Sequence, residues 1–151
     1  MDYEHTKMRE LNIIKEGSVV RQSYVEKGAS YAHEGNFGSE GEFYSLSQEC
    51  FLFKSPGYMY EVCPYYNATQ SSKEVWLIGT GGKLAGSHAE GFQLTMGNGR
   101  GDHCPDGKKR TTIIMFKCGP SDKIKYVSEK ETCIYVVKFD TPAACPPLEA
   151  T

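Results

Sequence analysis

The sequence predicts an all-β domain, a flattened barrel or sandwich of strands, and two kinds of segment support this prediction. Short runs rich in β-branched and aromatic residues recur after residue 43, at residues 58–62, 112–116 and 134–139. Clusters of glycine, proline, asparagine, serine and aspartate, which favour turns, separate the runs at residues 55–57, 79–82, 97–99 and 119–122. Many short strands at such spacing are typical of a sandwich or flattened barrel.

The first 36 residues have a different pattern. Met8, Leu11 and Ile14 recur at three-residue spacing between charged residues, which predicts a short amphipathic helix that ends near Gly17. The residues that follow are polar, with scattered glycine and no sustained period. We interpret residues 1–36 as a linker or the end of an upstream helical region, and residues 37–151 as the folded domain. A helix docked on the domain is the alternative interpretation.

Charge and hydropathy give no indication of a nucleic-acid or membrane partner. The formal net charge is −2 at pH 7, so no broad positive field is expected. No stretch approaches the roughly 20 apolar residues of a membrane-spanning helix. The first five residues lack the apolar segment of a signal peptide, so a secretory protein would carry its signal outside this sequence.

The cysteines predict disulfides and an oxidising compartment. There are six, none in the first 49 residues, at positions 50, 63, 104, 118, 133 and 145. No C-x-x-C pair is present, and His103 with Cys104 cannot complete a tetrahedral zinc site alone. We therefore expect no metal and no cofactor, while the spacing leaves the connectivity open. The acceptor tripeptide Asn67-Ala68-Thr69 makes Asn67 a candidate for N-glycosylation, which also fits a secretory lumen.

The sequence predicts a binding module rather than an enzyme. Glu129 and Glu131 lie near each other, but no partner carboxylate for hydrolysis can be identified. No serine or cysteine occupies a nucleophile elbow, and the four histidines have no metal or base spacing. The tripeptide Arg100-Gly101-Asp102 is formally an adhesion motif, but three residues carry little information. An adhesion module or a stand-alone enzyme therefore ranks last among the hypotheses.

Three segments resemble the mannose 6-phosphate receptor homology domain, a barrel-like lectin of the P-type with two antiparallel sheets. They read YEVCPYYNATQ at residues 60–70, CPDGKKR at 104–110 and VSEKETCIY at 127–135. Their order of Gln, Arg, Glu and Tyr, tied to the cysteine spacing, covers about residues 43–147. Within this family, the flanking residues 37–46 and 141–146 resemble those of the β subunits of glucosidase II.

The resemblance implies a mannose pocket formed by Gln70, Arg110, Glu129 and Tyr135. In that pocket Arg110 and Gln70 are expected to bind the 2-hydroxyl and its neighbour, because a guanidinium fork and an amide suit paired hydroxyls. Glu129 would accept from the 3- and 4-hydroxyls, and Tyr135 would add a hydroxyl and limit the pocket. No metal is needed.

The resemblance also implies three bridges, Cys50–Cys63, Cys104–Cys133 and Cys118–Cys145. Related β subunits carry tryptophan in the stretch that corresponds to residues 79–84. In this sequence the only tryptophan is Trp76, which we expect to pack in the core.

The function implied by the resemblance is that of a lectin in the endoplasmic reticulum lumen with no glycosidase chemistry of its own. Its partners would be terminal mannose residues of high-mannose N-glycans and a catalytic α subunit, the latter contacted through regions outside this chain. The alternative is a phosphomannose receptor domain or the γ subunit of the Golgi GlcNAc-1-phosphotransferase. Residues 102–104 are similar to a loop that contacts phosphate in such receptors.

Overall fold

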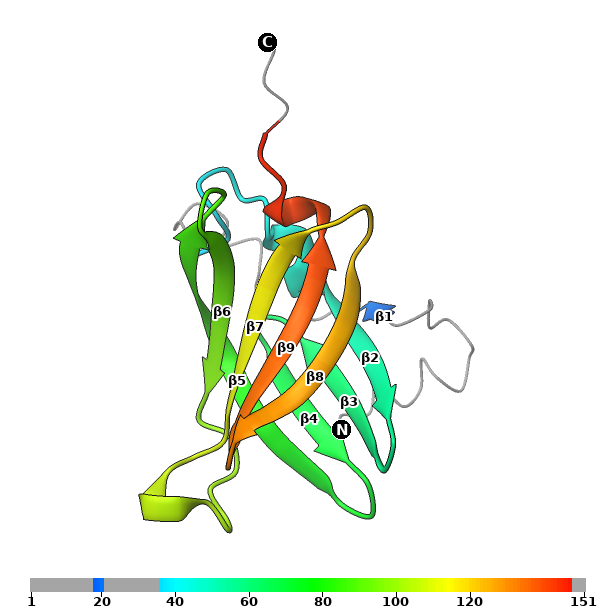
Figure 1. Ribbon diagram of the computed structural model, residues 1–151, viewed down its shortest axis with the longest axis vertical. Helices are drawn as coiled ribbons and strands as arrows, with labels where there is room; N and C mark the ends of the chain where they lie inside the picture. The colour runs from blue at the N-terminus through cyan, green and yellow to red at the C-terminus, as the bar shows by residue number, and fades with distance from the viewer. Residues whose placement is uncertain (1–17, 21–35, 148–151) are drawn as a thin grey trace.

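The computed structural model describes residues 18–20 and 36–147, and within these residues nine strands form one continuous sheet curved into a flattened barrel (Figure 1). The strands are β1 (Ser18–Val20), β2 (Glu49–Ser55), β3 (Tyr58–Cys63), β4 (Asn67–Ser71), β5 (Val75–Ser87), β6 (Gly91–Gly97), β7 (Thr111–Cys118), β8 (Lys123–Glu131) and β9 (Ile134–Thr141). Three short 3-10 helices complete the described elements, η1 (Tyr44–Gln48), η2 (Pro105–Gly107) and η3 (Pro142–Ala144). The predicted all-β class is confirmed.

The barrel has two layers that belong to the same sheet. Strands β2, β3 and β4 form one layer, and β6, β7, β9 and β8 form the other. The 13-residue strand β5 pairs with β4 and with β6 and so connects the two layers (Figure 1). All neighbouring strands are antiparallel except β7 and β9, because β8 lies outside β9 and the chain returns to pair with β7 in parallel. The edge strand β8 contacts β2, which is the neighbour of the other edge strand β1, so the barrel is nearly closed.

The predicted turn at residues 79–82 is wrong, because these residues lie within strand β5. The glycines serve close packing and a bulge instead of a chain reversal. A Cβ on Gly79 would lie 2.5 Å from the carbonyl oxygen of Met96 on β6. The register with β6 shifts between Thr80 and Lys83, and Gly81 there has a φ of +63°.

The core lies between the two layers. Alternate side chains of β7 and β9 point inward, since neighbouring residues on a strand face opposite sides of the sheet. Phe51 on β2 and Phe139 on β9 meet edge to face across the layers, with ring centroids 4.9 Å apart. Phe116 packs on the same Phe139 ring at 5.3 Å. Each such buried ring contributes roughly 1.5–3 kcal/mol. This burial stabilises β7 and β9, which begin beside Arg110 and Tyr135.

The three disulfides are Cys50–Cys63, Cys104–Cys133 and Cys118–Cys145, the pairings that the resemblance implies. The second one ties the loop before β7 to the turn between β8 and β9. The helix predicted around residues 8–14 lies outside the described residues. Within the described ranges, no helix is both long and apolar enough to span a membrane.

Candidate functional site

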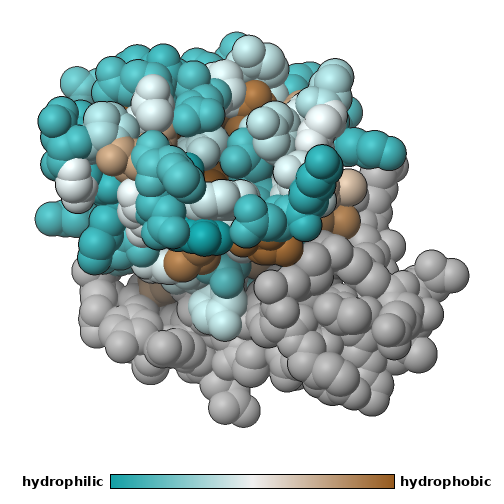
Figure 2. Space-filling model, turned by 90° about the horizontal axis from the view of Figure 1, so that it is seen from below, coloured by the Kyte–Doolittle hydropathy of each residue, from teal (hydrophilic) through white to brown (hydrophobic). Residues whose placement is uncertain are grey.

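The four predicted site residues converge at one end of the barrel. Gln70 lies near the end of β4, Arg110 directly before β7, Glu129 near the end of β8 and Tyr135 near the start of β9. These strand ends meet at the lower end of the molecule in Figure 1. Figure 2 views this end directly, and its coloured surface is mostly hydrophilic. The structure therefore brings together residues that are up to 65 positions apart in the sequence.

A chain of hydrogen bonds runs through the site. Arg110 donates its Nε–H to the hydroxyl of Tyr135 (3.4 Å), and that hydroxyl donates to Oε1 of Gln70 (3.5 Å). The Nε2 of Gln70 in turn donates to the hydroxyl of Tyr60 (2.9 Å). All four side chains are buried, with exposures of 9% for Arg110 and Gln70, 5% for Tyr60 and 1% for Tyr135. Each polar group in the chain is thus fixed in orientation by its neighbour.

The guanidinium of Arg110 has one nitrogen, Nη2, left for a ligand. Its Nη1 donates to the backbone carbonyls of Arg100 (2.9 Å) and Asp102 (2.7 Å). Its Nε is taken by Tyr135. Among the described residues, none accepts a hydrogen bond from Nη2. Two N–H donors, held in the plane of a rigid fork, are therefore available.

Glu129 supplies the acceptor side of the site. Its Oε2 accepts the backbone N–H of Cys133 at 2.8 Å, while Oε1 has no hydrogen-bond donor in the described part of the chain. Glu129 faces Tyr135 directly across β8 and β9. Because Cys133 is bonded to Cys104, the same bridge anchors the acceptor Glu129 and the loop that precedes Arg110.

Tyr60 belongs to the site although the sequence analysis did not select it. It lies opposite Gln70 in the pairing of β3 with β4. Burial raises the pKa of Tyr60 and of Tyr135, partly offset by hydrogen bonds from Gln70 and Arg110 respectively. Both hydroxyls therefore keep their protons and remain donors. The tyrosine stands in the recognised segment 60–70, but the strand register that turns it toward Gln70 cannot be read from the sequence.

Trp76 lines the site as well as packing on the core. It is partly buried against the core cluster, as expected, and lies opposite Gln70 in the pairing of β4 with β5. Two guanidinium groups also lie over its ring in cation–π contact, with the Cζ of Arg100 3.8 Å and the Cζ of Arg110 4.5 Å from the ring centroid. The indole thus forms one wall of the site, a role that the sequence analysis missed.

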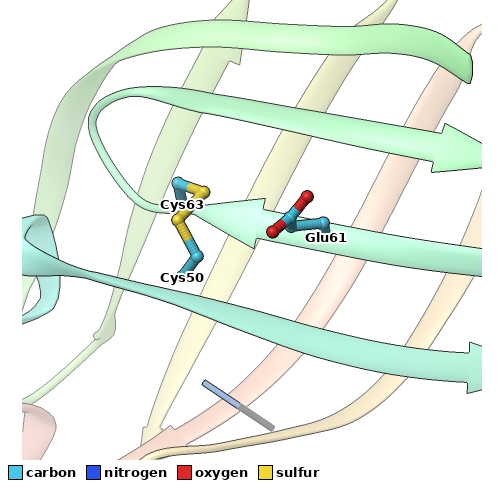
Figure 3. A group of neighbouring side chains, drawn as sticks. All are labelled: Cys50, Glu61 and Cys63. Atoms are coloured by element: carbon cyan, nitrogen blue, oxygen red, sulfur yellow. A yellow bond between two sulfur atoms is a disulfide. The ribbon is translucent and has the colours of Figure 1, made fainter. Parts of the chain in front are cut away.

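One group of potential metal donors occurs among the described residues, away from this site. The donor atoms of Cys50, Glu61 and Cys63 lie within 4.8 Å of one another (Figure 3). The two sulfurs are bonded to each other, however, and a disulfide offers no thiolate to a metal. This group is therefore part of the β2–β3 bridge and not a metal site.

Comparison with known proteins identifies the kind of domain. Residues 16–150 match the model of the family described as glucosidase II beta subunit-like protein. The glucosidase 2 subunit beta of Oryza sativa subsp. indica is 32% identical over 111 residues, which cover 73% of this chain and 17% of that protein. The human N-acetylglucosamine-1-phosphotransferase subunit gamma is 32% identical over 108 residues, which cover 69% of this chain and 35% of that protein.

A solved structure has the same fold. It is the solution structure of the MRH domain of Yos9 complexed with alpha3,alpha6-Man5, with a TM-score of 0.53, 19% identity, and coverage of 82% of this chain and 90% of that one. At this identity the likeness concerns the fold alone. The chain spans about a sixth of the length of the rice relative and about a third of the human γ subunit.

Proposed function

Because this chain belongs to the glucosidase II beta subunit-like family, we propose that its domain is a lectin for the terminal mannose of high-mannose N-glycans. The observation that carries the proposal is the arrangement of Nη2 of Arg110 and Oε1 of Glu129, a paired donor and a carboxylate acceptor fixed at one polar end of the barrel. Vicinal hydroxyls of a sugar each offer a donor and an acceptor, so such a pair can bind two of them together.

The site distinguishes mannose from glucose by the axial 2-hydroxyl. Arg110 and Gln70 bind this hydroxyl and its neighbour, and Glu129 accepts from the 3- and 4-hydroxyls. Tyr135, whose hydroxyl is already shared by Arg110 and Gln70, orients these two groups and closes the pocket from behind. A glucose epimer leaves buried polar groups unpaired, which costs about 1–3 kcal/mol for each group. Few contacts make a weak site, with a Kd on the order of micromolar to millimolar.

In the whole protein the domain acts as a non-catalytic part of a glucosidase II. It presents mannose-bearing glycoproteins to a catalytic α subunit that is bound through regions outside this chain, in the lumen of the endoplasmic reticulum. The family relationship and three disulfides support this assignment. Asn67, half-buried at the start of β4, is a candidate glycan acceptor of its own, and a mass shift on deglycosylation of secreted protein tests it.

Calorimetry with methyl α-mannoside and methyl α-glucoside tests the lectin function. Wild-type protein is expected to bind the mannoside and to bind the glucoside at least about 10-fold more weakly. Arg110→Lys is expected to abolish binding, because an ammonium group cannot serve Tyr135, two carbonyls and a sugar at once. Lys109→Gln, which removes an exposed cation next to it, is the control. Equal binding of both sugars, or full binding by Arg110→Lys, would contradict the proposal.

The second candidate is a phosphomannose site, which the similarity of residues 102–104 to a phosphate-contacting loop implies. One observation bears on it: Oδ2 of Asp102 already accepts from Nη2 of Arg100 at 3.2 Å, so a cation that used both oxygens of this carboxylate would have to displace Arg100. We expect mannoside binding to be unchanged by a chelator and no tighter for mannose 6-phosphate. Loss of binding with the chelator, or a strong preference for the phosphate, would favour this candidate.

A further inference from the structure

We infer that Arg100, Asp102 and Trp76 form a clasp that positions Arg110, so that the Arg-Gly-Asp tripeptide serves the sugar site and not adhesion. These three residues are positioning residues, because they act on the ligand only through Arg110. The inference rests on the proposed function for the identity of the ligand. The contacts that position Arg110 are present in the protein without a sugar.

The backbone of the tripeptide holds the guanidinium. The carbonyls of Arg100 and Asp102 both accept hydrogen bonds from Nη1 of Arg110. The backbone N–H of Arg110 also donates to the Arg100 carbonyl (3.3 Å), and the N–H of Arg100 donates to Leu77 on β5 (2.8 Å). Two carbonyls aimed at one nitrogen leave Nη2 as the free end of the fork. The orientation of the donor pair therefore depends on where residues 100–102 lie.

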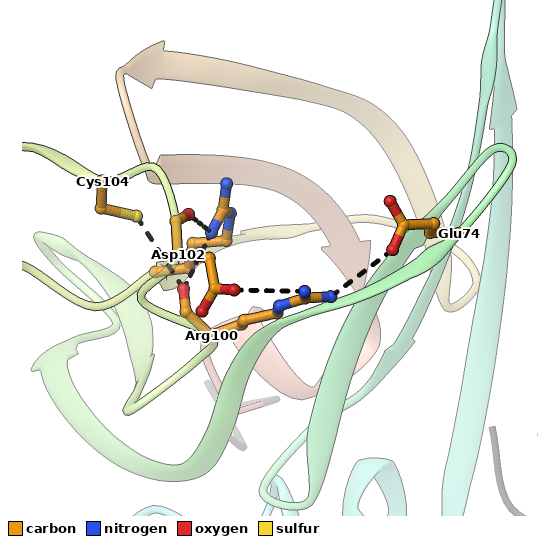
Figure 4. A network of polar contacts seen from close by, with 5 residues as sticks. Glu74, Arg100, Asp102 and Cys104 are labelled. Carbon is orange, nitrogen blue, oxygen red and sulfur yellow. Dashed lines mark hydrogen bonds and ion pairs between the residues drawn. The ribbon is translucent and has the colours of Figure 1, made fainter.

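The side chains of the tripeptide lock this loop in place. Arg100 donates through Nη2 to Oδ2 of Asp102 at 3.2 Å, and its Nη1 lies 3.9 Å from Oε1 of Glu74 in the β4–β5 turn (Figure 4). The hydrogen bond from Arg100 and its positive charge hold the pKa of the Asp102 carboxyl below its usual range. The ion pair thus connects the two residues whose carbonyls hold Arg110.

Trp76 joins the loop to the sheet. Its ring contacts both guanidinium groups, and the ring of His103 meets it edge to face at a centroid distance of 6.0 Å. Arginine stacks on an indole through its planar, weakly hydrated face, whereas lysine lacks that face. One aromatic side chain on β5 therefore fixes the loop and Arg110 relative to Gln70, its cross-strand partner.

The positioning is tested by NMR without any sugar. The Nε–Hε resonance of Arg110, assigned by its loss in Arg110→Lys, reports the hydrogen bond to Tyr135. In Asp102→Asn, Arg100→Lys and Trp76→Leu we expect this resonance to shift and to exchange faster with water. Trp76→Phe, which keeps an aromatic face, is expected to stay close to wild type, so that a rescue separates positioning from general destabilisation. Asp106→Asn and Lys108→Gln are the controls, exposed residues of the same loop.

The effect on the ligand is measured by calorimetry with methyl α-mannoside on the same variants. We expect Asp102→Asn and Arg100→Lys each to weaken binding by about two- to five-fold, the range of one exposed ion pair or stack. Trp76→Leu, which loses both stacks, is expected to weaken it more, and Trp76→Phe less. The mannose-to-glucose preference should fall together with affinity.

The outcomes separate the clasp from the lectin function. If wild-type protein does not bind mannoside but the Arg110 resonance responds as expected, the proposed function fails and the positioning stands. If wild-type protein binds and neither the resonance nor the affinity changes in the folded variants, the clasp is overturned. A changed resonance with unchanged affinity would overturn its role in binding.

Discussion

The hydroxyl of Tyr60 accepts a hydrogen bond of 2.9 Å from Nε2 of Gln70, directly across the β3–β4 pair. Gln70 is only 9% exposed, so losing this partner leaves a largely buried amide N–H without its hydrogen bond. Tyr60→Phe is therefore expected to lower the free energy of unfolding by about 1–3 kcal/mol and to weaken mannoside binding. Urea unfolding and calorimetry measure the two effects. Tyr126→Phe, on a ring that is 55% exposed on β8, is the control, and equal results for both variants would contradict this role of Tyr60.

Two glycines that are two residues apart are expected to differ sharply in tolerance. A Cβ on Gly99 would lie 2.7 Å from the carbonyl oxygen of Arg110 and 2.8 Å from that of Leu77, whereas a Cβ on Gly97 would meet nothing within 4 Å. Gly99→Ala should cost about 1–3 kcal/mol of stability, because both contacts are backbone atoms, and should weaken sugar binding by displacing Arg110. Gly97→Ala should do neither. Thermal unfolding and mannoside titration compare the pair.

The bridge Cys104–Cys133 is expected to matter for binding more than Cys50–Cys63. It joins the loop that precedes Arg110 to Cys133, whose N–H holds Glu129. Replacing both cysteines of either pair by serine should cost about 2–5 kcal/mol of stability. Only the loss of Cys104–Cys133 should also weaken mannoside binding by protein that is still folded at low temperature. Equal binding by the two double variants would show that this bridge does not organise the site.

At the opposite end of the barrel, Glu42 is expected to make stability depend on pH. Burial opposes its ionisation, but hydrogen bonds from the backbone N–H groups of Glu40 and Glu42 and from His88 hold its pKa below the usual value. A depressed folded pKa gives stability that is present above the unfolded pKa and lost as pH falls through the folded one. The stability difference between wild type and Glu42→Gln should therefore be fully present above the unfolded pKa of a glutamate, about 4.3, and shrink as the pH falls through the lower folded pKa.

The control for this pH dependence is Glu40→Gln. The Glu40 side chain is exposed, and only its backbone N–H contacts Glu42 (2.7 Å). Chemical denaturation of the three proteins across the pH range gives the comparison. A difference between wild type and Glu42→Gln that does not shrink at acid pH would contradict an ionised, hydrogen-bonded Glu42.

The sequence predicted the strands more reliably than the turns. The runs at residues 58–62, 112–116 and 134–139 became β3, β7 and β9, because β-branched and aromatic residues fit a half-buried pleated surface. The glycine cluster at residues 79–82 has the composition of a turn but packs against β6 within β5. Composition cannot tell a glycine needed for reversal from one needed for close approach, since both uses favour the absence of a Cβ.

The site residues, too, could be predicted only in part from the sequence. The cysteine framework and the order of Gln70, Arg110, Glu129 and Tyr135 pointed to a shared location, and the structure places all four there. Tyr60 and Trp76 were missed because their place depends on the register of β3 and β5 with β4, which only the folded sheet fixes. The division of the chain at residue 37 stays a prediction, since most of residues 1–36 lie outside the described part.

Trp76 offers the most direct test of the central claim, because it is the sole tryptophan and lies 4.5 Å from the guanidinium that is proposed to bind mannose. Its indole N–H gives a single resonance that can be followed during titration with methyl α-mannoside and methyl α-glucoside. The lectin proposal predicts a saturable shift with the mannoside, a much weaker response to the glucoside, and no shift in Arg110→Lys. An unchanged resonance in folded wild-type protein at saturating mannoside, or equal shifts with both sugars, would contradict it.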